Sequence, residues 1–214
     1  MGSALLAHIQ ATLSMNWAAP PPPIQRILES ACSLPFTENC QHEIYLDTVD
    51  TPLHGDRNRA SAYRDALAQI RFLADCGAPL NWATMAAVQS IMIKSDRVGF
   101  RTGDAYAKGG AERYTWFPKL EEMFLSKIEA DAKSNCNPIT KAVRTYLDII
   151  FFHPFVDGNA RAARLWFEFL LRRERVSLPS LYALAHLRKT PGSTSRYWAF
   201  VTLVGKLLLD SRGK

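Results

Sequence analysis

The chain has 214 residues, 48% of them hydrophobic, and a formal net charge of +6 at pH 7. This composition excludes a disordered chain and is enough for one domain with a sizeable core and a small extension. The basic charge suits an acidic partner or an anionic ligand. A simply basic surface explains it better than nucleic-acid binding, because no groove-reading motif is present.

The four cysteines, Cys32, Cys40, Cys76 and Cys136, have no CxxC or Cys/His spacing typical of a metal site. We expect them to be reduced, in the cytoplasm. No apolar run reaches the length of a membrane span, and the apolar start at 1–17 lacks the basic region of a secretory signal. Export by a specialised secretion system is an open alternative.

The first fifty residues contain two stretches with apolar residues at helical spacing. They predict helices over 3–16 and 24–33, separated by a stiff polyproline spacer at 20–23. The first helix could dock a partner or pack on its own domain, and the sequence favours neither. Residues 35–50 are polar and are predicted to be irregular, with a short extended piece at 43–46.

Apolar residues recur at helical spacing through most of the remaining chain. The predicted helices cover 56–75, 82–93, 119–132, 138–152, 159–173, 177–187 and 194–209. Asn81 and Asn137-Pro138 are typical of helix starts. Between 96 and 117, glycines and aromatic residues are interspersed, which predicts a β-hairpin that turns near Lys108-Gly109-Gly110. The predicted fold class is therefore all-α with one small hairpin.

Chemically active side chains are concentrated between His153 and Arg164, in the stretch His-Pro-Phe-Val-Asp-Gly-Asn-Ala-Arg-Ala-Ala-Arg. His153 is a proton acceptor near neutral pH, and Asp157 is a hard oxygen donor suited to a magnesium ion that keeps most of its waters. The helix that begins at Asn159 offers free backbone N–H groups to an anion, and Arg161 and Arg164 share one face of its first turn. A base, a metal carboxylate and a phosphate cradle predict phosphoryl or nucleotidyl transfer.

This stretch closely resembles the signature of the Fic family, His-x-Phe-x-Asp/Glu-Gly-Asn-Gly/Lys-Arg-x-x-Arg. One fixed position departs from it, where Ala160 replaces Gly or Lys. Ala160 would cost nothing in a right-handed conformation, whereas a positive φ would cost about 1 kcal/mol. The resemblance extends over roughly 81–205. It implies an all-α Fic-like domain at 81–214 that carries a small β-hairpin flap, behind an N-terminal helical extension at 1–80.

The resemblance implies Mg2+-dependent transfer of AMP from ATP to a Ser, Thr or Tyr hydroxyl of a target protein. His153 would be the general base, Asp157 the metal ligand, and Phe155 a buried anchor. The nucleotide phosphates would be bound by Gly158, Asn159, Ala160, Arg161 and Arg164. Relatives that transfer UMP, phosphate or phosphocholine are alternatives, although the phosphate-transferring Doc type has Ala in place of Gly158 and lacks the second arginine.

In the Fic family the hairpin flap pairs with the target backbone and steers the target hydroxyl to the histidine. By resemblance, the flap residues here are Arg101, Gly103, Tyr106, Lys108, Gly109, Gly110 and Tyr114. A surface hairpin without a partner is the alternative. Two further hypotheses belong to other classes: a non-catalytic module that binds a nucleotide, and a basic protein that binds nucleic acid in a salt-sensitive way.

Many Fic proteins carry an inhibitory helix, Ser/Thr-x-x-x-Glu-Gly/Asn, whose Glu pairs with the second arginine of the signature. Here His54 precedes Gly55, and Asp50 stands in the place of Ser or Thr. A neutral His cannot form that ion pair, so we expect weak restraint through Arg164, or an ordinary turn made by Pro52 and Gly55. A separate antitoxin-like partner that supplies the Glu is a further hypothesis, with the chain acting as a bacterial toxin or effector.

Overall fold

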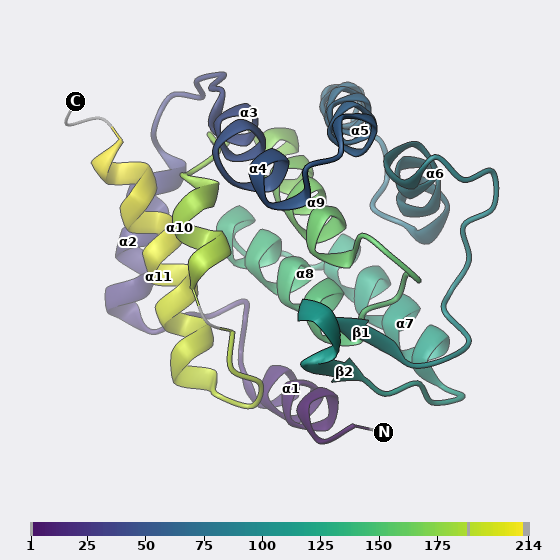
Figure 1. Cartoon of the computed structure of the whole chain (residues 1–214). Helices are drawn as coiled ribbons and strands as arrows, with labels where there is room; N and C mark the ends of the chain where they lie inside the picture. The colour runs from purple at the N-terminus through teal and green to yellow at the C-terminus, as the bar shows by residue number, and fades with distance from the viewer. Residues whose placement is uncertain (1, 188, 212–214) are drawn as a thin grey trace.

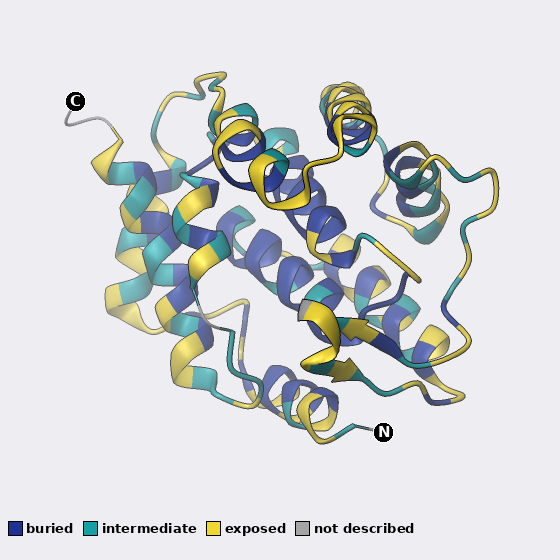
Figure 2. Ribbon diagram, viewed as in Figure 1, coloured by how far each residue is buried: buried dark blue, intermediate teal, exposed yellow. Residues whose placement is uncertain are grey.

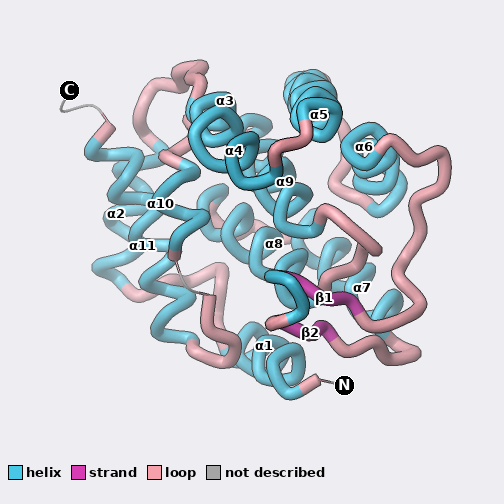
Figure 3. The backbone as a smooth tube through the Cα atoms, in the orientation of Figure 1, coloured by secondary structure: helices cyan, strands magenta, loops and turns pink. Residues whose placement is uncertain are grey.

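The computed structural model describes residues 2–187 and 189–211, and for Lys108 the backbone alone. These residues are mostly helical and contain one antiparallel sheet of two strands (Figures 1 and 3). The predicted class, all-α with a small hairpin, is confirmed. Within the described residues, no helix has both the length and the apolar character needed to cross a membrane.

The elements follow the chain with few long connections. The helices are α1 (Ser3–Ser14), α2 (Pro22–Cys32), α3 (Gln41–Tyr45), η1 (Leu46–Asp50), α4 (Thr51–His54), α5 (Arg57–Asp75), α6 (Trp82–Ile93), η2 (Lys108–Gly110), α7 (Leu120–Lys133), α8 (Pro138–Phe152), α9 (Asn159–Arg173), α10 (Leu181–His186) and α11 (Thr194–Asp210). The strands are β1 (Ala105–Ala107) and β2 (Glu112–Tyr114). Most predicted helices agree within a few residues, and α10 is shorter than the predicted 177–187.

The prediction for residues 35–50 is wrong in its second half. Instead of an irregular segment with an extended piece, α3, the π-helical turn η1 and α4 follow one another without a break. Tyr45, Leu46 and Val49 are buried in the core, and this burial outweighs the weak local signal for a helix. The consequence for the site is that Asp50 is brought into the interior, where it is 3% exposed.

Two adjacent helices, α8 and α9, form the centre of the molecule. They pack closely on each other, and α9 also packs on α5. Most residues of both central helices are buried, whereas the outer helices have an exposed side (Figure 2). The loop between α8 and α9 holds the signature motif, so both of its ends are fixed by helices of the core.

The N-terminal helices pack on the rest of the chain. His8 of α1 is fully buried, with its ring nitrogens 2.7 Å from Asp148 Oδ1 and 2.8 Å from Tyr197 Oη. On α11, a Cβ at Gly205 would come within 2.8 Å of Ile27 Cγ2, so glycine permits the close approach of α2. Of the two alternatives for the first helix, packing on its own domain is therefore the one observed. The domain boundary at residue 80 stays a prediction.

Candidate active site

The loop between the two central helices is shaped by two residues with positive φ. His153 ends α8 in the left-handed region, with φ 48°, and its N–H donates to Ile149 O at 3.0 Å. Gly158 precedes α9 with φ 79°. Its positive φ favours glycine, and a Cβ there would have to displace the ends of two side chains, since it would lie 2.8 Å from Met92 Cε and 2.9 Å from Gln89 Nε2.

Side chains of the motif itself brace this loop. Asn159 Nδ2 donates to Phe155 O at 2.8 Å, and Phe155 N donates to Asn159 Oδ1 at 2.9 Å. The Phe155 ring is 1% exposed and stacks on Trp82 with centroids 5.0 Å apart, as expected of a buried anchor. Gln89 Nε2 donates to Asp157 O at 2.5 Å. Because its side chain is used within the loop, Asn159 can contribute to anion binding only through its backbone N–H.

His153 is held as a neutral imidazole. Its Nδ1 lies 2.8 Å from Ile150 O, and because a carbonyl can only accept, Nδ1 carries the proton and Nε2 keeps its lone pair. The ring of Tyr114 stacks on it at a centroid distance of 3.4 Å. Burial lowers the pKa of His153 to about 4. At neutral pH, Nε2 is therefore available to accept a proton.

The start of α9 lies where the sequence predicts an anion cradle. Its first N–H groups have no partner in the preceding turn, and the N-cap Gly158 has no side chain that could occupy them. Ala160 is exposed and lies inside α9 in right-handed conformation. The departure from the signature at this position therefore costs nothing and suits the helix.

Two nitrogen donors of Arg161 have no hydrogen-bond partner among the described residues. Its side chain is buried, and Nη2 lies 3.0 Å from Asp157 Oδ2. Among the described residues, its Nε and Nη1 are buried and have no hydrogen-bond partner. Burial lowers the pKa of Arg161, and the charge of Arg59 lowers it further. Unpaired guanidinium N–H groups beside a helix N-terminus fit a phosphate.

Asp157 is the residue that the sequence predicts as the metal ligand. Its side chain is 64% exposed and lies beside Arg161 at the open end of the cradle. No cluster of three or more His, Cys, Asp or Glu residues is found within 2–187 and 189–211. A single carboxylate fits Mg2+ when water and substrate phosphates supply the other ligands, and the free donors of Arg161 leave room for such phosphates.

Arg164, one turn further along α9, is surrounded by its own chain. Its guanidinium carbon lies 4.5 Å above the Tyr45 ring, and Nε donates to Tyr63 Oη at 3.1 Å. Its Nη2 lies 3.6 Å from Asp50 Oδ1, and both side chains are buried. His54 Nε2 lies 3.5 Å from the same carboxylate oxygen. Asp50, rather than His54, is therefore the residue that faces the second arginine.

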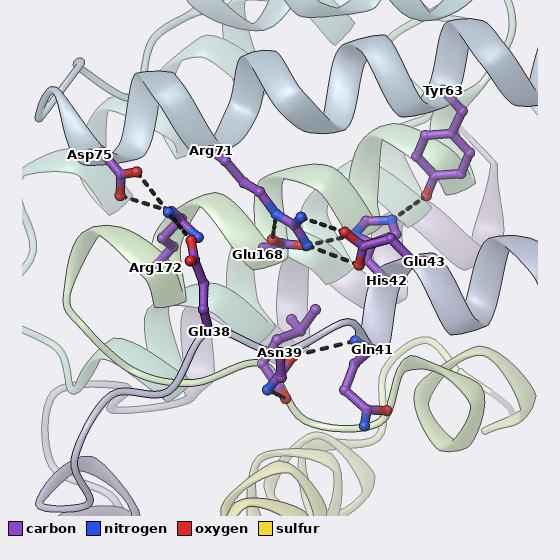
Figure 4. Close-up of polar contacts among 11 residues, drawn as sticks. Glu38, Asn39, Gln41, His42, Glu43, Tyr63, Arg71, Asp75, Glu168 and Arg172 are labelled. Atoms are coloured by element: carbon purple, nitrogen blue, oxygen red, sulfur yellow. Dashed lines mark hydrogen bonds and ion pairs between the residues drawn. The ribbon is translucent and has the colours of Figure 1, made fainter.

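Tyr63, which accepts a hydrogen bond from Arg164, belongs to a polar network with His42, Glu168 and Arg71. Figure 4 shows this network. Tyr63 Oη lies 2.8 Å from His42 Nε2, and His42 Nδ1 donates to Glu168 Oε2 at 2.7 Å. Arg71 Nε donates to the other oxygen of Glu168 at 2.6 Å. Burial alone would raise the pKa of Glu168, but these bonds hold that pKa below its ordinary value. The network joins α3, α5 and α9 and fixes the position of Tyr63.

The predicted hairpin is present and turns where the sequence indicated. β1 and β2 pair in antiparallel register, with Tyr106 opposite Arg113. Lys108, Gly109 and Gly110 form the turn η2, where both glycines have positive φ. Tyr106 is 61% exposed, so this part of the flap is open to solvent.

The flap is joined to the histidine through buried contacts. Arg101 is 4% exposed, and its Nε donates to His153 O at 2.6 Å while Nη1 donates to Gly103 O at 2.6 Å. Its Nη2 donates to Phe152 O at 3.2 Å. The structure therefore brings Arg101 and Tyr114 into contact with His153, and Gly103 into contact with Arg101, whereas Tyr106 is exposed to solvent.

Comparison with known proteins agrees with this geometry. Residues 79–171 match the model of a family described as Fic/DOC. This part of the chain is therefore a Fic domain. At the coarse level it is therefore a Fic-type transferase, a class that generally transfers nucleotides or phosphate-containing groups. The comparison with curated proteins finds no match.

Several solved Fic structures share the fold. The complex of an IbpAFic2 variant with adenylylated Cdc42 has a TM-score of 0.64 at 13% identity, over 97% of this chain and 75% of that chain. A Fic domain containing signaling protein from Bacteroides thetaiotaomicron has a TM-score of 0.52 at 18% identity, over 98% and 94%. Fic-1 from C. elegans has a TM-score of 0.53 at 15% identity, over 89% and 70%. At such identities the likeness shows the fold alone.

Sequence reasoning missed two residues that contact Arg164, namely Asp50 and Tyr63. In the sequence, Asp50 only stands in the place of Ser or Thr in an inhibitory pattern, and Tyr63 lies in the predicted helix 56–75 without a signal for a polar contact. Had 50–54 been considered as a helix, the spacing of Asp50 and His54 would have put both on one face. Nothing in the local sequence indicates that this face meets Arg164.

Proposed function

We propose that this Fic protein transfers AMP from ATP to a Ser, Thr or Tyr hydroxyl of a target protein. The observation that carries the proposal is the position of the neutral His153 between the flap and a helix start lined by unpaired donors of Arg161. A base beside an anion cradle is suited to attack on phosphorus, where positioning and charge neutralisation do most of the catalysis.

In the proposed reaction, the target hydroxyl oxygen attacks the α-phosphorus of ATP. Its proton passes to Nε2 of His153, while the Nδ1–H bond to Ile150 O keeps the ring oriented. The bond from the α-phosphorus to the bridging oxygen breaks, and pyrophosphate leaves. The free N–H groups of Arg161 and of the first turn of α9 stabilise the negative charge that develops on the leaving group.

Asp157 would bind Mg2+ through its exposed carboxylate. When bound, the ion neutralises charge on the phosphates of the nucleotide. Because Arg161 pairs with Asp157, it lies close enough to bind the same phosphate group as an ion held by Asp157. The donor set thus favours a cation held jointly by protein and nucleotide.

The target is proposed to be a protein that pairs with the exposed edge of the flap. Such β-augmentation reads backbone more than sequence, so the hairpin would position a hydroxyl without choosing it strictly. IbpAFic2 has been crystallised with adenylylated Cdc42, which supports a protein target for this chain as well. We propose the cytoplasm as its location, with export by a secretion system as the alternative.

The test is incubation of the purified chain with Mg2+ and ATP, followed by intact-mass analysis of the chain and of a cell lysate. His153→Asn is the matched control, because Asn tolerates the left-handed conformation of this position. An added AMP that is absent in the control supports the proposal. Binding of ATP without any adduct, in the presence of lysate, would contradict it and favour a non-catalytic nucleotide-binding module.

The alternative group transfers are separated by the same experiment with other donors. UTP, CDP-choline and ATP give adducts of different mass, and an added phosphate would indicate a kinase-like relative. Gly158 and Arg164, which the phosphate-transferring type lacks at these positions, favour AMP transfer over phosphate transfer. If another donor than ATP gave the adduct, the proposed substrate would change and the proposed site would stay the same.

A further inference from the structure

Helices α5 and α9 lie side by side and run in the same direction. Tyr63 Oη is 3.5 Å from Arg161 O, and about two turns further along both helices Arg71 Nε is 2.6 Å from Glu168 Oε1. The first turn of α5 therefore lies at the same end of the molecule as the anion cradle at the start of α9. A cationic side chain on the side of this turn that faces α9 would therefore face the anion cradle.

Arg59 is such a cation. It lies in the first turn of α5, four residues before Tyr63, and is partly buried. Its Nε is shielded from solvent and has no hydrogen-bond partner among the described residues. Arg64 and Arg71 on the same helix pair with Asp47 and with Glu43 and Glu168, whereas no ion pair is found for Arg59 within 2–187 and 189–211.

The unpaired Nε–H of Arg59 and the unpaired donors of Arg161 lie at the same end of the two helices. Arg59 lies one turn before Tyr63 on the same face of α5, and Tyr63 Oη is 3.5 Å from Arg161 O. The Arg161 side chain reaches back to Asp157, with Nη2 3.0 Å from Oδ2, so both guanidinium groups lie at the level of the start of α9. Arg161 itself has two buried nitrogens without a partner, and its one carboxylate, Asp157, contacts only Nη2. Two like charges with shielded, unused N–H groups beside a helix N-terminus are unfavourable unless an anion lies between them.

We propose that Arg59 is a third arginine of the phosphate site, where it binds the polyphosphate leaving group of the nucleotide together with Arg161. The inference rests on the proposed function and adds the residue that makes the site selective for a triphosphate over a monophosphate. Arg59 contacts the terminal phosphates, which leave as pyrophosphate, and does not contact the hydroxyl or the base. Pyrophosphate alone should therefore bind to the same arginines.

The test is calorimetric titration of the full chain with pyrophosphate and, separately, with AMP, both in the presence of Mg2+. Arg59→Gln removes the charge at similar size, and Arg57→Gln is the matched control, because Arg57 is exposed in the same helical turn. We expect Arg59→Gln to weaken pyrophosphate binding about tenfold and to leave AMP binding unchanged. Arg57→Gln should change neither affinity.

Kinetics give a second readout of the same role. With ATP as donor, Arg59→Gln should raise KM for ATP by about tenfold and change kcat less, as expected for lost binding of the terminal phosphates. If Arg59→Gln does not fold, Arg59→Lys keeps the charge without the two-pronged fork and should weaken pyrophosphate binding by a smaller factor.

Two results would overturn the inference: wild-type protein that does not bind pyrophosphate, or equal affinities in wild type, Arg59→Gln and Arg57→Gln. A failure of the proposed function has a different signature. In that case the wild type would bind pyrophosphate in an Arg59-dependent way but would transfer no group to any protein.

Discussion

The two arginines of the signature lie three residues apart on one helix, yet they have opposite surroundings. The open end of the site is formed by Arg161 and Asp157, where buried guanidinium donors lack partners and the carboxylate is exposed. The closed end is formed by Arg164, Tyr45, Tyr63 and Asp50, where the guanidinium is stacked, hydrogen-bonded and ion-paired. Spacing along a helix sets which face a side chain shares, and the packed neighbours decide whether its donors are free.

The largest expected difference between the two ends is in stability. Arg164→Ala would remove the guanidinium beside Asp50, which is 3% exposed, and leave its carboxylate with His54 alone. We expect the free energy of unfolding to fall by about 4 kcal/mol. Arg161→Ala would break only an ion pair with an exposed carboxylate, so it would change the free energy of unfolding by less than about 1 kcal/mol. Urea denaturation of both variants measures the difference, and equal losses would show that the two ends are equally built into the fold.

For transfer activity, the dependence on the open end should be strong. Arg161→Ala would remove the unpaired donors at the anion cradle and is expected to slow AMP transfer by about a hundredfold. The measurement is the initial rate at saturating ATP. Asp157→Asn, which removes the exposed carboxylate but leaves the arginine, serves as the companion variant. A rate unchanged by Arg161→Ala would place the phosphates elsewhere.

Much of the open end could be predicted from the sequence, because the chemistry of its residues is local. Gly158 can adopt positive φ, the helix that follows presents its own N–H groups, and the spacing of Arg161 follows from the helical turn. Each of these properties depends on a residue and its immediate neighbours. The fold class and most helix bounds could be predicted for the same reason, since apolar spacing is also a local pattern.

The closed end could not be predicted, because it depends on polar residues that are satisfied by distant partners. The carboxylate of Asp50 is buried beside Arg164 and His54, and His42 is buried where Glu168 and Tyr63 bond to it. In the sequence these residues make 35–50 look like a solvated loop. Arg101 is a similar case, since four backbone carbonyls near the histidine bind a side chain that is usually exposed.

A substitution of Gly158, at the open end, tests whether the anion cradle tolerates a change in backbone conformation. Gly158→Ala would place a methyl group 2.8 Å from Met92 Cε in a residue with φ 79°. We expect a loss of about 2 kcal/mol in unfolding free energy and a reduced rate of transfer. Ala160→Gly is the control in the same loop, because its position is helical and exposed, and it should cost only about 1 kcal/mol. Similar costs for the two variants would contradict the described loop conformation.

The pH dependence should report His153 rather than either arginine. Its pKa is lowered to about 4, so protonation removes the base only when pH falls toward that value. Transfer should be nearly constant from about pH 8 to 6 and should fall about tenfold per unit below about pH 4. The same depressed pKa means that the unfolded state takes up the proton first, so stability should decrease as pH falls from about 6.5 to about 4. A half-maximal rate near pH 6.5 would contradict the buried neutral state.

The smallest expected effect, and the one that bears most directly on the closed end, is a gain of activity. Asp50→Asn keeps the size of the side chain but removes the charge that lies 3.6 Å from Arg164 Nη2. If Arg164 also binds a phosphate of ATP, as the family resemblance implies, freeing it should raise the rate at low ATP by about fivefold. Asp47→Asn is the control, because Asp47 is exposed on the same turn and pairs with Arg64 instead.

The effect of Asp50→Asn on the rate of transfer distinguishes two sources of inhibition at Arg164. A purified wild-type chain that is inactive, together with an active Asp50→Asn variant, would mean that Asp50 itself restrains Arg164 and that no separate inhibitor is required. A wild-type chain that is active alone, with a variant no faster than the Asp47→Asn control, would mean that the 3.6 Å contact is too weak to compete with a phosphate. An antitoxin-like partner acting on Arg164 would then remain the proposed source of control, and the closed end would be a structural support for the helix rather than a regulator.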